Sequence, residues 1–460
     1  MFIGKATKKI PRWRDLPAAL LQEVLGFLKP EEVTGSARSV NKTWSLTPAA
    51  WPRVDITGHL GIYAGCNPVR VRCLHLDDRW PDIKLEHFRN LRDLTLLHGC
   101  AHLQAGAILS HLERLTLQGA DTIPAAIANL PGLRELVVNG GLANTSLRSI
   151  GLVTQLHSLE ISLNLEVDAT DHGFAHLAAL TNLTTLRVKS RELFVSPAVL
   201  GRILSSIGPN LRALELSRLI SEQCSAHIVR NCPQLEDLTL APSPMTSTRH
   251  RLDLRFLVDL TRLVKLSVAG DFGLYDLGPL NAPLRALTLR NLSLDDLAFV
   301  GALQELEDLS LELQSGVDTW PLANLRRLRV FHLQSRGLSD THFDVVAHLP
   351  SLRELRLSRA SSVAGTMTDA GLVHLCALHQ LQKLTLRNFS EFTDRGLAHL
   401  ARLCELQFLS LHPCSEITLS ALRTVSWPSL KRLELFFLGA KRRARARRLF
   451  AHAAVVCFPE

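Results

Sequence analysis

One six-residue pattern, Leu-x-x-Leu-x-Leu with Val, Ile or Phe allowed at the apolar positions, recurs along most of the chain. From the first copy to the last is 359 residues in fifteen steps, a mean spacing near 24 residues. Leucine supplies 91 of the 460 residues, so one side chain is used repeatedly. The chain must therefore fold as stacked copies of one unit. The sixteen copies begin at Val71, Leu91, Leu112, Leu133, Leu156, Leu183, Leu211, Leu235, Leu263, Leu284, Leu306, Leu328, Leu352, Leu381, Leu406 and Leu430.

The pattern itself predicts a strand with two unlike faces. In the copy that begins at Leu381, the fourth and sixth residues, Leu384 and Leu386, point to the same side of a strand. The residues beside them, Lys383 and Arg387 among them, point to the other side. No single unit can bury its own leucines, so neighbours must stack into a solenoid that exposes a polar stripe on a parallel sheet.

Two later copies add a helix signal. Thr368 and Thr393 each open the sequence Thr-Asp-x-Gly-Leu-x-x-Leu, in which Thr or Asp can cap a short helix that the leucines anchor. The unit length, together with Cys100 and Cys414, resembles the cysteine-containing class of leucine-rich repeats. That resemblance implies an α/β horseshoe solenoid with its parallel sheet on the concave face, and it places both cysteines at a buried turn.

The first fifty residues follow a different period. Apolar residues from Leu16 to Leu28 recur at spacings of three and four, Pro17 suits a first helical turn, and Pro30 ends the helix. Residues 31–51 predict two further short helices. About forty residues seldom bury enough surface to be stable alone, so a partner or the repeats must cover them.

This N-terminal segment resembles the F-box, the motif by which substrate receptors dock on the Skp adaptor of cullin-RING ubiquitin ligases. In combination with the repeats, it resembles the F-box/leucine-rich-repeat family. The expected domains are a basic lead-in at 1–11, a three-helix F-box at 12–52, repeats at 53–438, and a basic tail or C-terminal cap at 439–460. The resemblance implies that adaptor binding falls to Leu16, Pro17, Leu20, Val24, Leu28, Val40, Lys42 and Trp44.

Charge and motifs narrow the function further. The net charge of +9 comes from residues 1–14 and 441–448, because removing their eleven bases leaves 41 bases against 43 acids. A nearly neutral body argues against a broad nucleic-acid footprint. Gly-x-Gly-x-x-Gly, Gly-x-Ser-x-Gly and His-Glu-x-x-His do not occur, so we expect a chain without catalytic residues or cofactors. The longest apolar runs of the sequence are shorter than the ~18–20 residues needed to cross a bilayer, so no membrane association is expected.

Cysteine and histidine usage leaves two smaller questions. The nine cysteines are odd in number and never form Cys-x-x-Cys, which predicts free thiols in a reducing, cytoplasmic setting. His98, Cys100 and His102 could be imagined as zinc ligands, but Cys100 falls on the repeat's turn position, so we expect no metal. The basic run 441–448 suits nuclear import, or else a solvated helix whose continuation through Val456 caps the repeats.

The last four repeats carry the largest outward side chains. Earlier repeats mostly place small groups such as Ala213 and Ser267 there. Aromatic and Arg side chains anchor protein interfaces, so we expect a target protein on this third of the concave face. A tail folded over the Phe residues, a scaffold or inhibitor without ligase assembly, and a small-molecule sensor remain alternatives. The candidate target contacts are Arg356, Arg387, Phe408, His412 and Phe436.

Overall fold

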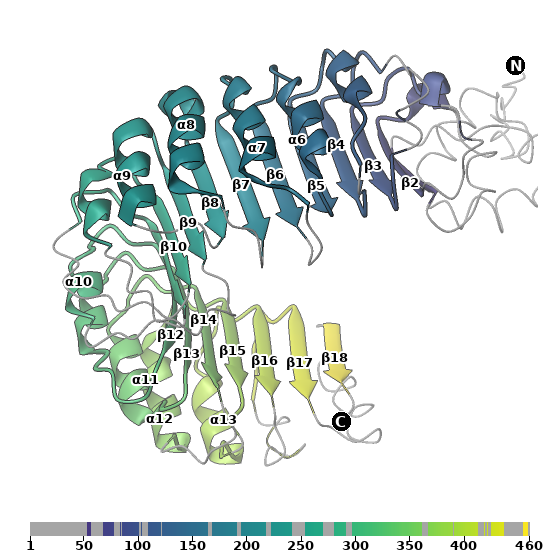
Figure 1. Ribbon diagram of the computed structural model, residues 1–460. Coiled ribbons are helices and arrows are strands. Elements are labelled where there is room, and N and C mark those ends of the chain that lie inside the picture. The colour runs from purple at the N-terminus through teal and green to yellow at the C-terminus, as the bar shows by residue number, and fades with distance from the viewer. Residues whose placement is uncertain are drawn as a thin grey trace, which may run out of the picture. The chain divides into compact units, whose positions relative to one another are not determined.

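The computed structural model shows two compact units, the first ending at Leu211 and the second beginning at Arg212. Each unit is a series of parallel strands with helices on one side of them (Figure 1). Among the described residues, no helix is long and apolar enough to cross a bilayer. The structure describes residues 53–56, 68–77, 83, 85–100, 103, 109–120, 122–163, 168–190, 195–217, 222–241, 254–269, 280–290, 297–360, 367–389, 391–412, 418, 421, 425–436 and 454–458.

The first unit pairs seven strands in chain order, each parallel to the next. Its longest helix begins where the sequence favours it, because Pro197 is the first helical residue and the Ser196 side chain accepts a hydrogen bond from the Val199 amide. The strands are β1 (Arg53–Ile56), β2 (Cys73–Asp77), β3 (Asp93–Leu97), β4 (Arg114–Gln118), β5 (Glu135–Gly140), β6 (Ser158–Leu163) and β7 (Thr185–Ser190). The α-helices are α6 (Asn144–Gly151), α7 (Asp171–Phe174) and α8 (Pro197–Ile207), and the 3-10 helices are η3 (Pro68–Arg70), η4 (Leu85–His87), η5 (Ala125–Asn129), η6 (Ala175–Ala179) and η7 (Gly208–Asn210).

The second unit continues the same plan, with every strand parallel to its neighbour. Its strands are β8 (Ala213–Ser217), β9 (Asp237–Ala241), β10 (Lys265–Ala269), β11 (Ala286–Arg290), β12 (Asp308–Leu313), β13 (Val330–Ser335), β14 (Glu354–Arg359), β15 (Lys383–Arg387), β16 (Phe408–His412), β17 (Arg432–Phe436) and β18 (Ala454–Phe458). Its α-helices are α9 (Glu222–Asn231), α10 (Ala298–Gly301), α11 (Asp340–Ala347), α12 (Asp369–His374) and α13 (Asp394–Leu400), with 3-10 helices η8 (Arg255–Asp259), η9 (Trp320–Asn324) and η10 (Leu375–Ala377).

The repeat positions predicted from the sequence are confirmed. Each of the strands β2–β17 begins two residues after a predicted repeat start. The fourth and sixth positions also face the core as expected: Leu384 lies in register with Leu355 and Leu409, and all three are fully buried. The fold is therefore an α/β solenoid of leucine-rich repeats, in which each repeat's leucines are covered by the repeats beside it.

Two strands lie outside the sixteen predicted copies. β1 pairs with β2, and β18 pairs with β17. The prediction of a capping helix that continues through Val456 is therefore wrong for residues 454–458. These residues form a strand that extends the sheet. The physical reason is twofold: Val455 and Val456 are β-branched residues that favour strands, and the backbone groups of β17 need a partner at the edge of the sheet.

Threonine and aspartate link successive helices through a ladder of paired hydrogen bonds. Thr368 caps α12 by accepting a hydrogen bond from the Ala370 amide. The Thr368 amide and hydroxyl also donate to the two carboxylate oxygens of Asp340 in the preceding repeat, both at 2.8 Å. Thr393 donates in the same way to Asp369, at 2.9 and 2.5 Å. Capping by Thr is confirmed, and the motif's Asp has a further role in joining its repeat to the next.

The same ladder explains the glycine of the Thr-Asp-x-Gly motif. A Cβ on Gly371 would lie 2.4 Å from Asp340 Oδ1, and one on Gly396 would lie 2.3 Å from Asp369 Oδ1. Any larger residue would therefore displace the carboxylate that receives the next threonine. The ladder continues at Thr418, whose amide and hydroxyl each lie 2.6 Å from an Asp394 carboxylate oxygen.

Replacing Asp369 by Ala should lower the free energy of unfolding by about 1–3 kcal/mol. The reason is that the amide and the hydroxyl of Thr393 both lose the carboxylate oxygen to which they donate. Asp369→Asn should lose less, since one amide oxygen can still accept from the Thr393 amide. Urea denaturation followed by circular dichroism checks both. Asp259→Ala, an exposed position at the end of η8, is the matched control, and an equal loss there would contradict the ladder's importance.

Thiol reactivity provides a second test of the core. The structure describes the surroundings of six cysteines, and these surroundings differ. Burial raises the pKa of Cys232 to about 12, whereas Cys404 is exposed. Iodoacetamide should therefore alkylate Cys404 in the native protein and reach Cys232 only after unfolding, because the thiolate is the reactive form. Peptide mass spectrometry measures this, and native labelling of Cys232 as fast as Cys404 would be the contrary result.

Candidate functional site

The strands expose one face, which we call the outward face: the first, third and fifth residues of each strand, opposite the buried leucines. Side chains from adjacent strands lie in register across it. Because the repeat fixes the inward positions, chemistry that differs from one repeat to another is concentrated on this face. Solenoid proteins use such continuous strand faces as binding surfaces.

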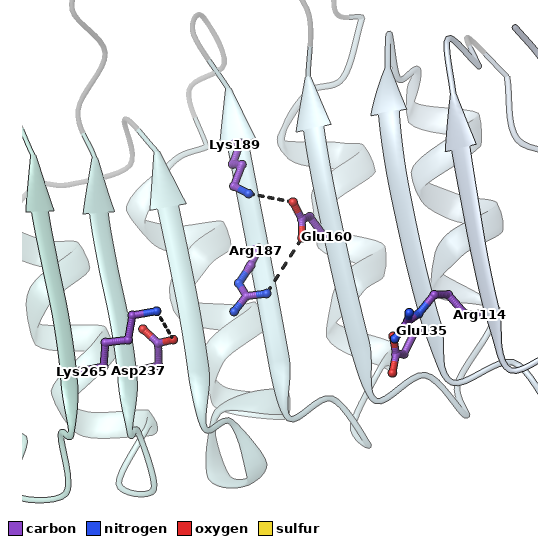
Figure 2. A network of polar contacts seen from close by, with 7 residues as sticks. All are labelled: Arg114, Glu135, Glu160, Arg187, Lys189, Asp237 and Lys265. Carbon is purple, nitrogen blue, oxygen red and sulfur yellow. Dashed lines mark hydrogen bonds and ion pairs between the residues drawn. The ribbon is translucent and has the colours of Figure 1, made fainter. Parts of the chain in front are cut away.

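In the first unit, the cations of the outward face are neutralised. The described strands β2–β7 contain three Arg or Lys side chains, and each has an acidic partner. Arg187 and Lys189 of β7 both turn toward Glu160 of β6, and Lys189 Nζ lies 2.7 Å from a Glu160 oxygen (Figure 2). Arg114 of β4 pairs with Glu135 of β5 at 2.5 Å (Figure 2). This face therefore presents little uncompensated charge.

The second unit begins with a similar pair and then changes. Lys265 of β10 lies 3.3 Å from an Asp237 oxygen of β9 (Figure 2). Further along, Glu354 receives two partners, Lys383 at 2.9 Å and His332 at 3.2 Å. Three arginines remain: Arg290 of β11, Arg356 of β14 and Arg387 of β15 are exposed, and none has an ion pair or side-chain hydrogen bond among the described residues. These three guanidinium groups thus have no direct acidic partner among the described residues.

A hollow of about 200 Å³ lies between the unpaired arginines, on strands β11–β14. Arg290 borders it from β11, and Arg356 and Ser358 border it from β14. Glu312 and Gln334 lie between them and share a hydrogen bond of 3.4 Å. The complete lining is Arg290, Ser310, Leu311, Glu312, His332, Leu333, Gln334, Arg356 and Ser358. The hollow is small and polar, so it fits one or two side chains of a partner better than a large apolar ligand.

Two carboxylates beside the hollow have pKa values that are shifted in opposite directions. Burial raises the pKa of Asp308, and the nearby negative charge of Glu354 adds to that effect. For Glu354, burial acts in the same sense, but hydrogen bonds from Lys383 and His332 outweigh it and hold its pKa below the ordinary value of 4.5. Glu354 is therefore an ionised anchor for Lys383 and the His332 ring, which leaves Arg356 without an acidic partner on its own strand.

The structure places four of the five predicted target contacts on the outward face. It does not describe the side chain of the fifth, Phe436. Arg356 and Arg387 are exposed, and Arg387 lies in register with His412, which is half-buried. Phe408 is half-buried, with the Arg432 guanidinium 6.0 Å from the centre of its ring. Phe436 ends β17, and its side chain lies outside the described part.

The outward side chains of this face are not equally exposed. Thr385 points to the outward side but is only 5% exposed, and Ser410 beside it is 2% exposed. Both are short side chains lying in register between the longer Arg356 and Glu434, and a short side chain between longer neighbours loses its access to solvent. The accessible surface there is therefore formed by the strand ends, where Arg387 lies.

Sequence reasoning missed the residues of β11–β13. The outward positions of those strands include Arg290, Glu312, His332 and Gln334, which are large polar side chains. The signal was available, because these residues occupy the same repeat positions as Arg356 and Arg387. Comparing every repeat, instead of the last four with the first, would have found them.

The remaining predicted residues lie elsewhere. All eight residues predicted to bind the adaptor, from Leu16 to Trp44, fall outside the described residues. Cys100 is buried as the repeat resemblance implied, and its thiol donates to the Thr122 carbonyl at 2.8 Å. His98 occupies a left-handed turn beside it, with φ of 65°, while His102 is outside the described part. Cys100 is thus part of the scaffold.

These features define a leucine-rich-repeat protein. The solved complex of TLR13 with ssRNA13 shares the fold, with a TM-score of 0.52 and 18% identity over 82% of this chain and 60% of that one. A leucine-rich-repeat protein of Leptospira interrogans has a TM-score of 0.43 and 18% identity over 88% of this chain and 100% of that one. An internalin of Listeria monocytogenes has a TM-score of 0.41 and 19% identity over 74% and 86%.

Sequence similarity supports the narrower family resemblance. The chain is 27% identical over 204 residues to the Arabidopsis thaliana protein named "Putative F-box/LRR-repeat protein 22". The match covers 39% of this chain and 64% of that protein. No protein-family model matches the chain. The resemblance to F-box/leucine-rich-repeat proteins therefore has support from a relative as well as from residues 16–44.

The ion pairs around Glu354 predict a specific acid titration. Its lowered pKa means that the paired state stabilises the fold fully above pH 4.5, and that this contribution is lost as the pH falls through the folded-state pKa. Lys383→Met should raise the Glu354 pKa, because the ammonium group that donates a hydrogen bond to this carboxylate is removed. Side-chain carboxyl NMR measures the shift. Lys431→Met, at an exposed lysine before β17, should leave it unchanged, and an unmoved Glu354 in both variants would refute the assignment.

Proposed function

We propose that this chain is the substrate-recognition subunit of a Skp-cullin-F-box type ubiquitin ligase. In this proposal residues 12–52 dock on the Skp adaptor, and through it on a cullin, while the repeats hold a target protein. The observation that carries the recognition half is the outward face of the second unit. There Arg290 and Arg356 border a hollow, Arg387 lies on the next strand, and none of the three has an ion pair among the described residues. Arginines in this state are suited to anchor a partner protein.

The division of labour follows from what the residues of that face do. His332, the ring beside the hollow, is held by Glu354 at 3.2 Å, and Glu354 is held in turn by Lys383. This arrangement fixes side chains in place for binding. The proposed role of the chain is therefore to position a target, and ubiquitin transfer belongs to other subunits of the assembly.

The adaptor half of the proposal rests on sequence. Leu16 and Pro17 match the start of the F-box pattern, and the helical spacing through Leu28 offers an apolar face of the kind that enters a groove on a partner. The A. thaliana relative supports the same combination by its name. A chain that binds targets through its repeats but never captures an adaptor would instead be a scaffold or inhibitor.

Replacing Leu16 and Pro17 by Ala should abolish capture of the Skp adaptor by the full chain, because the variant removes the apolar groups expected to enter the groove. Pull-down with purified adaptor measures the loss, which should exceed tenfold. Leu152→Ala is the matched control, since Leu152 is a leucine of the repeats that is 53% exposed. Unchanged adaptor binding by the Leu16 and Pro17 variant, or no binding by the wild type, would overturn the ligase assignment.

A further inference from the structure

The outward faces of the two units differ in how their cations are compensated. On β2–β7 each Arg and Lys has an acidic neighbour, and in the second unit Lys265, Lys383 and Arg432 do too. Covering an ion pair with a partner removes two opposite charges from water together. Covering an unpaired guanidinium leaves a buried charge, which is costly unless the partner supplies an anion. A partner that covers Arg290, Arg356 and Arg387 must therefore be acidic.

The three arginines are spaced so that one segment can meet them all. Arg290 on β11 and Arg356 on β14 are separated by three strand spacings, roughly 14 Å at ~4.8 Å per strand, and the hollow lies between them. Arg387 lies one strand further, in register with Ser358, which lines the same hollow. Ser310 and Gln334 add neutral hydrogen-bonding groups within it.

The negative groups on this face decide which kind of anion fits. Glu312 lines the hollow, and Asp308 and Glu354 lie on the same strands nearby. The two arginines and Glu312 of the lining sum to one positive charge, which one carboxylate neutralises and a phosphate with close to two negative charges would exceed. Nucleic acid would bring many phosphates toward all three acids. The mixed lining therefore favours carboxylate side chains.

The chain's own tail does not have the required charge. Residues 441–448 carry six bases and no acid, so like charges would repel the tail from the unpaired arginines. The basic run is therefore not the source of the acidic group.

We infer that the target bound by the second unit presents an extended segment with at least two Asp or Glu side chains, one carboxylate seated between Arg290 and Arg356 and another reaching Arg387. This inference rests on the proposed function and adds the chemistry of the recognised segment. It extends the target contacts to β11–β13, where Arg290, Glu312 and Gln334 help to select the ligand.

The test uses the full chain and a fluorescent twelve-residue peptide with alternating Glu and Ser, read by fluorescence anisotropy. The wild type should bind it, and the same peptide with Gln for Glu should bind at least tenfold more weakly. Arg290→Gln combined with Arg356→Gln should weaken Glu-peptide binding at least tenfold and reduce its salt dependence. Arg326→Gln is the matched control, since Arg326 is exposed in the turn before β13 and has no ion pair among the described residues. Equal thermal unfolding of all variants shows that the fold is intact.

Several results would overturn the inference. These are equal binding of the Gln peptide, no binding of the Glu peptide, an unaffected double variant, or tighter binding of a phosphoserine peptide or a single-stranded oligonucleotide. A loss of binding on replacing Arg442, Arg443 and Arg445 by Gln, instead of on the double variant, would place the site on the tail. Adaptor pull-down with the same proteins separates the two proposals. Adaptor capture without Glu-peptide binding refutes only this inference, and Glu-peptide binding without adaptor capture refutes only the ligase role.

Discussion

The structure depends on burying the fourth and sixth residues of each repeat between parallel strands held in register. Leu355, Leu384 and Leu409 occupy equivalent positions in successive strands and are fully buried, yet none of these repeats could cover its own leucines. Each strand therefore needs a neighbour on both sides, and the hydrogen-bonded register ensures that leucine meets leucine. The strand β18 beyond the last repeat meets the same requirement at the end of the sheet.

This constraint separates stability from recognition along the chain. The inward residues are fixed by packing, so the outward residues of the same strand can vary without disturbing the core. The first unit uses that freedom for ion pairs such as those at Glu160, whereas the second leaves three arginines uncompensated. Similar strands thus give faces of different chemistry, and the difference arises only from the residues between the leucines.

Much of this could be predicted from the sequence. The period located all sixteen repeat strands, because apolar spacing alone decides which residues face the core. Pairing on the outward face could not be predicted in the same way. Lys383, Arg356 and Arg387 look alike in the sequence, but Glu354 engages only the first of them, since that contact depends on rotamers and register between repeats. The hollow likewise needs side chains from four strands.

A buried arginine shows the limit most clearly. Arg359 stands at an inward position of β14, beyond the six-residue pattern, and is only 2% exposed. Its guanidinium donates to the Asn388 carbonyl and to both carboxylate oxygens of Glu391, about thirty residues later. Asn388 adopts a left-handed conformation there, with φ of 64°. A charge that is balanced only by the next repeat has no local signature in the sequence.

The ladder between helices has a consequence for how such a chain can change in length. Thr368, Thr393 and Thr418 follow one another at intervals of 25 residues, and each binds the aspartate of the repeat before it. A repeat in this series therefore supplies a threonine that binds the repeat before it and an aspartate that binds the repeat after it. Duplication or loss of one whole unit would rejoin a threonine to an aspartate, whereas an insertion of a few residues would separate them. Over evolution, this part of the molecule can lengthen or shorten its binding face in steps of a single repeat.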